Sequence, residues 1–264
     1  MAYFTLERTL PMKETLYTIP LTDAFKAQGE CPFCYIERNV EQDLLDFVLG
    51  SGSSYMESDV REATDKAGFC RSHFKKMFDY GNTLGNGWIL KTHYVQMNKE
   101  FGQQLKMYSP QKASFLNKFG KNSGSGNPLT TWIREKEKSC YICQRFDDTY
   151  ARYLDTFFFM YKKDDEMTHM LEQSKGLCLH HYGDVCEAAD LKLNEKQKET
   201  FFPLINSLMA KNLEKVGNDV SWLVEKFDYR NKDADWKDSK DAIQRSMQKL
   251  WGGYPEDAPY RSSK

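Results

Sequence analysis

Long hydrophobic runs are missing from this sequence. Its longest clearly apolar stretch covers only residues 157–161, whereas a helix needs about 20 apolar residues to cross a bilayer. Residues 1–20 also lack a basic segment followed by an apolar run, which is the pattern of a secretory signal. We therefore expect no signal peptide, no contact with a membrane and a cytoplasmic location.

Net charge is almost absent as well. The chain has 37 Lys and Arg residues against 38 Asp and Glu residues, which gives a formal charge of -1. Proteins that coat nucleic acid nonspecifically are strongly basic, because phosphate contacts supply most of that binding energy. The balance argues against this class, and a nucleic-acid-binding regulator remains only as the weaker alternative.

Alternating strand patterns are nearly absent. Apolar residues recur at helical spacing instead, for example at Leu90, Tyr94, Phe101 and Leu105, which is the stripe of an amphipathic helix. Two capping boxes are predicted to begin helices, Asp59 with Glu62 and Asn194 with Gln197. The sequence therefore predicts an all-α protein.

The cysteines form one pattern that occurs twice. Each copy reads Cys-x2-Cys, a gap of 35 or 34 residues, and then Cys-x2-His with a glycine two places before the third cysteine. Six of the seven cysteines belong to these copies, which predicts an internal repeat. The ligands are Cys31, Cys34, Cys70 and His73 in the first copy and Cys140, Cys143, Cys178 and His181 in the second.

Three thiolates and one imidazole at this spacing are typical of a tetrahedral zinc site. We expect two zinc ions per chain, each held by the four ligands of one repeat. Iron–sulfur clusters or a thiol redox centre are the alternatives. His181 keeps the spacing of the first copy, although the adjacent His180 is a second choice, and Cys186 is expected to be a free buried thiol.

The repeat gives a division of the chain. Residues 1–20 are expected to form an N-terminal strap with an extended segment at 15–19, and residues 21–110 the first metal-binding helical repeat. A Gly- and Ser-rich segment predicts a flexible linker at 111–128. Residues 129–230 form the second repeat, and 231–264 a C-terminal helix and tail.

One segment has no counterpart in the second repeat. Residues 55–62 mix aromatic, acidic and basic side chains just before the first Gly-x-Cys. The plainer interpretation is a capped helix start. The sharper one is recognition of a ligand or partner by Tyr55, Glu57, Asp59 and Arg61.

Four motifs carry a family resemblance: residues 16–20, 31–34, 54–61 and 68–73. Together they resemble an uncharacterised family of anaerobic Firmicutes with two CxxC…GxCxxH units, some members of which bear a transporter substrate-binding label. The resemblance covers residues 12–230 and implies no established activity. The label disagrees with a chain that lacks an export signal and an α/β pattern.

Metal sites closed by four protein ligands favour a structural role over a catalytic one. The sequence does not indicate a particular reaction. We therefore favour a non-enzymatic protein in which structural zinc supports the binding of an unknown protein or small molecule. The alternative is a thiol redox or metal-responsive regulator.

Overall fold

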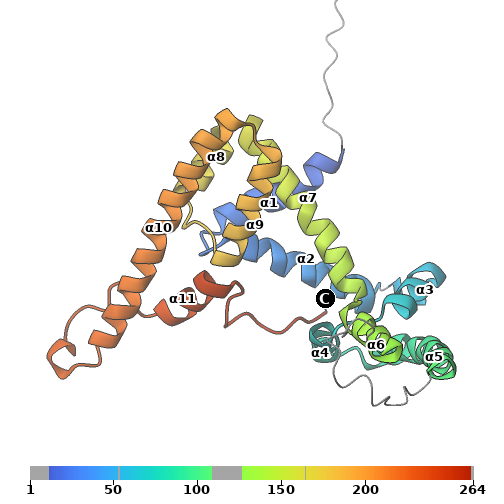
Figure 1. Cartoon of the computed structure of the whole chain (residues 1–264). Coiled ribbons are helices and arrows are strands. Elements are labelled where there is room, and N and C mark those ends of the chain that lie inside the picture. Colours follow the sequence, from blue (N-terminus) through green and yellow to red (C-terminus); the bar gives the residue numbers. More distant parts are fainter. Residues whose placement is uncertain (1–11, 53, 109–126, 164, 263–264) are drawn as a thin grey trace, which may run out of the picture. The chain divides into compact units, whose positions relative to one another are not determined.

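A computed structural model describes residues 12–52, 54–108, 127–163 and 165–262 (Figure 1). These residues form helices joined by short connections, and no strand occurs among them. The predicted all-α class is confirmed. The chain divides into two compact units: unit 1 contains the residues up to Val40 together with Asp148–Ala258, and unit 2 contains Glu41–Asp147 with Pro259–Lys264.

Unit 1 is assembled from both ends of the chain. It takes the first part of α2 and the later part of α7, and the chain passes from one unit to the other within these two helices. Its elements are α1 (Met12–Lys26), α2 (Pro32–Leu49), α7 (Tyr141–Lys163), α8 (Asp165–Gln173), α9 (Leu179–Lys192), α10 (Glu195–Glu225), η3 (Tyr229–Asn231) and α11 (Ala242–Trp251).

Unit 2 contains the middle of the chain. It includes the rest of α2, the first residues of α7 and the elements between them. These are η1 (Ser54–Met56), α3 (Ser58–Ala67), α4 (Arg71–Tyr80), α5 (Thr83–Met107) and α6 (Pro128–Lys138). Most of the predicted linker, residues 111–126, lies outside the described residues.

The N-terminal segment differs from the prediction. Residues 15–19 belong to α1 and are helical rather than extended, with Pro20 inside the helix. Leu21, Ala24 and Phe25 are buried at helical spacing, so packing outweighs the one backbone donor that proline removes. The strap prediction relied on local pattern alone.

Each unit has its own core. In unit 1 an aromatic cluster joins α2 and α7, with the rings of Phe33 and Phe157 5.6 Å apart. Phe25 of α1 and Phe201 of α10 extend it, at 6.0 Å from Phe157 and 5.5 Å from Phe158. In unit 2 the buried cluster includes Leu45, Val48, Leu49, Val60, Phe69, Met77, Tyr80, Ile89, Cys140, Tyr141 and Ile142. A candidate metal ligand, Cys140, is thus part of the hydrophobic core.

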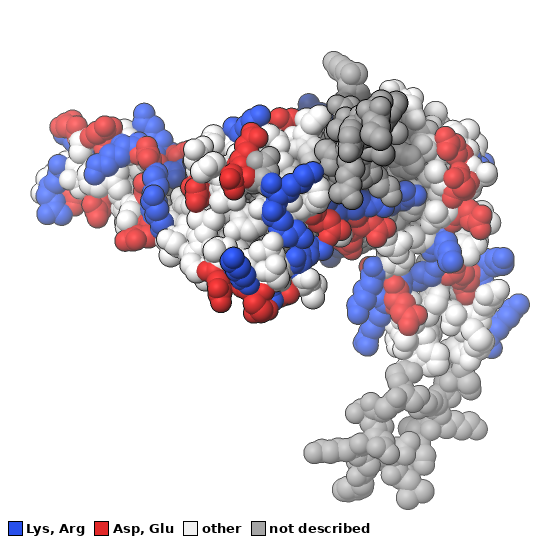
Figure 2. Space-filling model, turned by 90° about the horizontal axis from the view of Figure 1, so that it is seen from above, with Lys and Arg blue, Asp and Glu red and all other residues white. Residues whose placement is uncertain are grey.

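The surface carries both signs of charge. On the face shown in Figure 2, Lys and Arg side chains are interspersed with Asp and Glu side chains, as the formal charge of -1 predicts. Among the described helices, none has both the length and the apolar character needed to span a bilayer.

Candidate metal centres

The eight predicted ligands gather in two groups of four, with the ligand atoms of each group within 4.8 Å of one another. We call them site 1, in unit 1, and site 2, in unit 2. Site 1 contains Cys31, Cys34, Cys178 and His181, and site 2 contains Cys70, His73, Cys140 and Cys143.

The predicted pairing is wrong. Each site combines the Cys-x2-Cys of one sequence copy with the Cys-x2-His of the other. The compact units follow the same exchange and therefore differ from the predicted repeats at 21–110 and 129–230. Because both copies carry the same donor types, exchanging partners leaves each ligand set unchanged, and spacing alone could not reveal it.

In site 1 the imidazole lies among three sulfurs. His181 Nδ1 is 3.3 Å from Cys31 Sγ, 3.5 Å from Cys34 Sγ and 3.1 Å from Cys178 Sγ. The sulfurs of Cys34 and Cys178 are 3.7 Å apart. All four residues are buried, and His181 and Cys178 are 0% exposed. His181 therefore belongs to this group, whereas the adjacent His180 is exposed and lies outside it.

Site 2 has the same arrangement. His73 Nδ1 lies 3.2 Å from Cys70 Sγ, 3.2 Å from Cys140 Sγ and 3.3 Å from Cys143 Sγ. The sulfurs of Cys70 and Cys143 are 3.8 Å apart. In contrast to site 1, Cys70 and Cys143 are only half-buried. Site 2 is the more accessible of the two.

Helix starts build both sites. In every one of the four motifs the first ligand directly precedes a helix and the second is the third helical residue. The amides of the first turn have no partner within the helix, so they stabilise negative sulfur. Two such bonds are the amide of His181 to Cys178 Sγ and that of Cys143 to Cys140 Sγ, both 3.4 Å.

A glutamate on α2 contacts the outer nitrogen of each histidine. Glu41 Oε1 lies 3.0 Å from His73 Nε2, and Glu37 Oε2 lies 3.3 Å from His181 Nε2. Such carboxylates fix the orientation of a ligating imidazole and increase its basicity. Neither glutamate is among the site residues predicted from the sequence. The signal was their position three and seven residues after Cys34, on the helix face that carries this ligand.

Hydrogen bonding changes the acidity of these groups. Burial alone would raise the pKa of Cys70, but bonds with Ser72 and His73 lower it to about 6. Burial would lower the pKa of His73, but Cys140 and Glu41 raise it to about 10. Thiolate and imidazolium therefore balance each other in site 2, and a dication that binds there takes the place of protons.

Glycines with left-handed backbone connect helices to the ligand motifs. Gly68 has φ +65° and Gly176 has φ +76°. A Cβ on Gly68 would meet His93 Cε1 at 2.9 Å. The Gly68 carbonyl also accepts a 2.9 Å hydrogen bond from the Tyr141 amide, which ties the two halves of site 2 together.

Gly68→Ala is expected to destabilise the protein by about 2–3 kcal/mol, because it adds the strain of a positive φ to a side-chain clash. Urea unfolding of the metal-loaded protein measures this change. Gly102→Ala is the matched control. A Cβ at Gly102, inside α5, has no neighbour within 4 Å, so alanine should be neutral or slightly stabilising. Equal midpoints for the two variants would contradict the conformational role of Gly68.

Cys186 and the residues of the predicted recognition segment belong to neither group of ligands. Cys186 is half-buried rather than fully buried, and burial raises its pKa. In the segment, Tyr55 packs on the core of unit 2 while Glu57 and Asp59 are exposed. Arg61 donates to the Met56 carbonyl at 2.9 Å. It also lines a cavity of about 430 Å³ between α3 and α5, which the other three do not.

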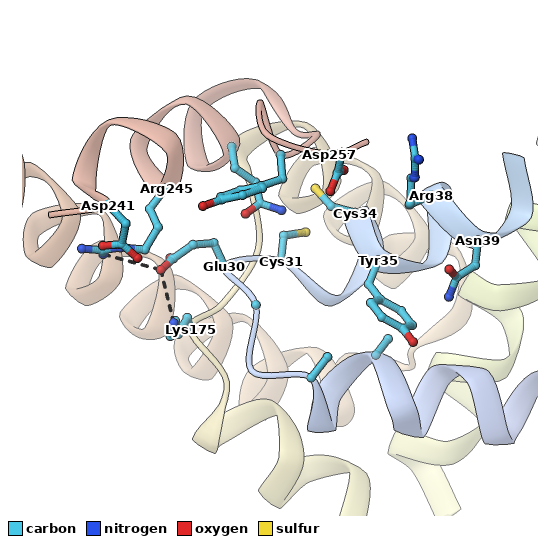
Figure 3. A pocket seen from close by; sticks show the side chains of 15 residues that line it. Glu30, Cys31, Cys34, Tyr35, Arg38, Asn39, Lys175, Asp241, Arg245 and Asp257 are labelled. Carbon is cyan, nitrogen blue, oxygen red and sulfur yellow. Dashed lines mark hydrogen bonds and ion pairs between the residues drawn. The ribbon is translucent and has the colours of Figure 1, made fainter. Parts of the chain in front are cut away.

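A second cavity, of about 440 Å³, adjoins site 1 (Figure 3). Cys31 and Cys34 form part of its wall, with α11 opposite them. Figure 3 shows Glu30 between Arg245 and Lys175, and Arg38 and Asn39 further along the wall. Its wall joins residues from distant parts of the chain, so no local sequence pattern predicts this cavity.

Fold and geometry thus define an all-α protein with two Cys3His groups that could each hold a metal ion. A family model described as a family of unknown function, DUF6062, matches residues 12–257. The chain belongs to this family. Neither the search of curated proteins nor the search of solved structures found a match.

Proposed function

We propose that this chain is a non-enzymatic binding protein in which two structural zinc ions hold the helices in place. The observation that carries the proposal is the closed ligand set, four protein donors around each point with three of them thiols. Structural zinc sites are closed in this way, whereas catalytic zinc keeps a position for water.

The donor atoms have the spacing that one tetrahedral zinc ion requires. Zinc–sulfur bonds of about 2.3 Å place two sulfurs about 3.8 Å apart around a tetrahedral ion. The sulfur pairs measured here are 3.7 and 3.8 Å apart. An iron–sulfur cluster contains several metal and sulfide atoms between its ligands, and donor atoms this close together leave no room for them.

Element analysis of protein purified without oxygen tests the metal assignment. We expect about two zinc ions per chain, one for each closed site, and no visible absorption band. Iron together with a brown colour would overturn the zinc assignment.

The cavity beside site 1 supports a binding role. Its charged wall contains Arg38, Lys175 and Arg245 against Glu30, Asp241 and Asp257. This balance suits a small polar ligand with little net charge. The side chain of Gln248 also lines the cavity, and this residue is only 8% exposed. Its carboxamide offers both a donor and an acceptor to a polar ligand in the cavity.

A thermal-shift screen with free amino acids and nucleosides tests the cavity. A compound that binds there should raise the melting temperature of the wild-type protein and lose this effect in Gln248→Leu, which removes the carboxamide that lines the cavity. Gln244→Leu, on the same helix, is the matched control, since Gln244 instead donates to Glu256 at 2.6 Å. No shift with any compound, or equal shifts in both variants, would count against this ligand site.

A redox or metal-responsive role has one observation in its favour, which is the partial exposure of Cys70 and Cys143. Accessible thiolates react with oxidants and alkylating reagents, while buried metal-bound thiolates are inert. If the protein senses oxidant or metal, site 2 is the site that responds.

Alkylation of the metal-loaded protein with iodoacetamide, followed by mass spectrometry, is expected to modify Cys70 and Cys143 well before Cys31 and Cys178. The reason is accessibility, since Cys31 is 2% and Cys178 is 0% exposed. Cys186 is an internal reference, because it is half-buried and belongs to neither site. Equal rates for the cysteines of the two sites would exclude selective reactivity at site 2. If mild peroxide releases no zinc at doses that leave the fold intact, the sensor alternative fails.

A further inference from the structure

A third cluster of possible ligands lies on the outer side of site 1. The donor atoms of Glu37, His180 and His181 are within 4.8 Å of one another. Asp184 adds a fourth group, with its Oδ2 3.7 Å from His180 Nε2. The His180 side chain is 57% exposed, so solvent reaches the cluster. It is therefore open to water, in contrast to the buried sulfurs behind it.

Within the part of the chain that the structure describes, only histidines form ion pairs with the carboxylates of this cluster. Among the described residues, Glu37 forms an ion pair only with His181, and Asp184 only with His180. No described lysine or arginine pairs with either carboxylate, and the further partner of Asp184 Oδ2 is the neutral Tyr150 hydroxyl, which donates to it at 3.2 Å. The ligand set of site 1 adds a net charge of about -1 when it holds a dication, because three thiolates face two positive charges. A cation is favoured at this point.

Site 2 provides an internal comparison. Its glutamate, Glu41, also contacts the outer nitrogen of a histidine, but Lys76 and the Tyr260 hydroxyl bind the same carboxylate. Lys76 follows His73 by three residues, and the residue three after His181 is Asp184. Beside the glutamate of site 2 the protein places a lysine. Beside the glutamate of site 1 it places a second carboxylate, Asp184, and the exposed imidazole of His180.

The outer nitrogen of His181 is a second observation at this cluster. Its Nε2 is fully buried and makes no hydrogen bond of good geometry, although Glu37 Oε2 lies 3.3 Å away. Buried polar nitrogens are rarely left without a partner. The carboxylate of Glu37 has two oxygens, so one can remain beside His181 while the other binds a ligand.

We propose that Glu37 and His180, with Asp184 at the edge, bind a divalent transition-metal ion as a third metal site. Imidazole with carboxylate suits zinc, cobalt or nickel rather than magnesium or calcium. Two or three protein donors leave positions for water, so this site is open and its ion exchanges more readily than those of sites 1 and 2. The proposal adds a function for an exposed histidine that the closed sites do not use.

Titration with cobalt tests the site, starting from protein that holds two cobalt ions in the thiolate sites. We expect a third, weaker equivalent that adds no thiolate-to-cobalt charge-transfer absorption, because its ligands are nitrogen and oxygen. In His180→Ala the affinity for this equivalent should fall about tenfold or more, since even the loss of an outer-shell partner costs that much. The first two equivalents and the helical circular dichroism should not change.

His169→Ala is the matched control, because His169 is also exposed and lies 3.3 Å from a glutamate, Glu172, on its own helix. It should keep the third equivalent. The proposal is overturned if the wild-type protein binds no third cobalt, if His180→Ala binds it as tightly as wild type, or if His169→Ala loses it equally. Saturating magnesium should not compete, and full competition would also contradict the assignment.

Discussion

Removal of the two proposed zinc ions by a strong chelator is expected to unfold most of the helical structure. Structural zinc contributes about 10–16 kcal/mol of apparent binding free energy at neutral pH, and the net stability of a domain is about 5–15 kcal/mol. The metal-binding free energy is therefore as large as the whole stability. Circular dichroism during titration with chelator measures the loss, and added zinc should reverse it.

Each site combines the Cys-x2-Cys of one sequence copy with the Cys-x2-His of the other. Because of this crossed pairing, the loss of one ion should affect one compact unit. Cys178→Ser should remove the ion of site 1 and raise amide hydrogen exchange in α1, α8 and α10, all of which belong to unit 1. Unit 2, with site 2 intact, should keep protection in α3 and α5. Pairing within each repeat would instead leave α1 protected. Unchanged exchange in every helix would contradict a structural role for the metal.

Glu30→Gln is expected to cost about 3–5 kcal/mol in the free energy of unfolding, because it leaves a buried charge without its partner. The Glu30 carboxylate is 4% exposed and lies 3.1 Å from Lys249 Nζ, whose side chain is 1% exposed. Lys175 and Arg245 lie 3.5 and 3.6 Å away. Lys249 also donates to the carbonyls of Glu30 and Lys175 at 2.7 Å, so the network joins α11 to the segments before α2 and α9.

Asp155→Asn provides the comparison for this change. Asp155 pairs with Lys192, but its side chain is 61% exposed, and exposed ion pairs contribute about 0–1 kcal/mol. Urea unfolding of the two variants in the metal-loaded state should separate them clearly. A cost below about 1 kcal/mol for Glu30→Gln would show that the buried pair is not needed for stability.

Local patterns predicted which cysteines and histidines gather in the two groups, because each motif is a few residues long and its chemistry depends on those residues alone. Spacing separated His181 from His180, and the glycine before each third cysteine does have a positive φ. The same holds for the capping box of Asn194 and Gln197, which begins α10. These features need no information from distant parts of the chain.

Other features required the tertiary structure. The Asp59 capping box is wrong, since α3 begins at Ser58 after Glu57, which makes no side-chain cap. The exchange of partners between the two copies depends on which helix starts meet, and both copies offer the same donors. The roles of Glu37 and Glu41 follow from that exchange. The chemistry of each residue could be predicted from the sequence, but the contacts between distant segments could not.

The pairing of the motifs is the central claim, and cadmium-substituted protein tests it without any mutation. Heteronuclear correlation between cysteine protons and a spin-active cadmium isotope identifies the cysteines that bind the same ion. We predict that Cys34 and Cys178 share one cadmium resonance, while Cys70 and Cys143 share the other, as the sulfur distances of 3.7 and 3.8 Å require. Correlation of Cys34 and Cys70 with a single cadmium would contradict the crossed arrangement.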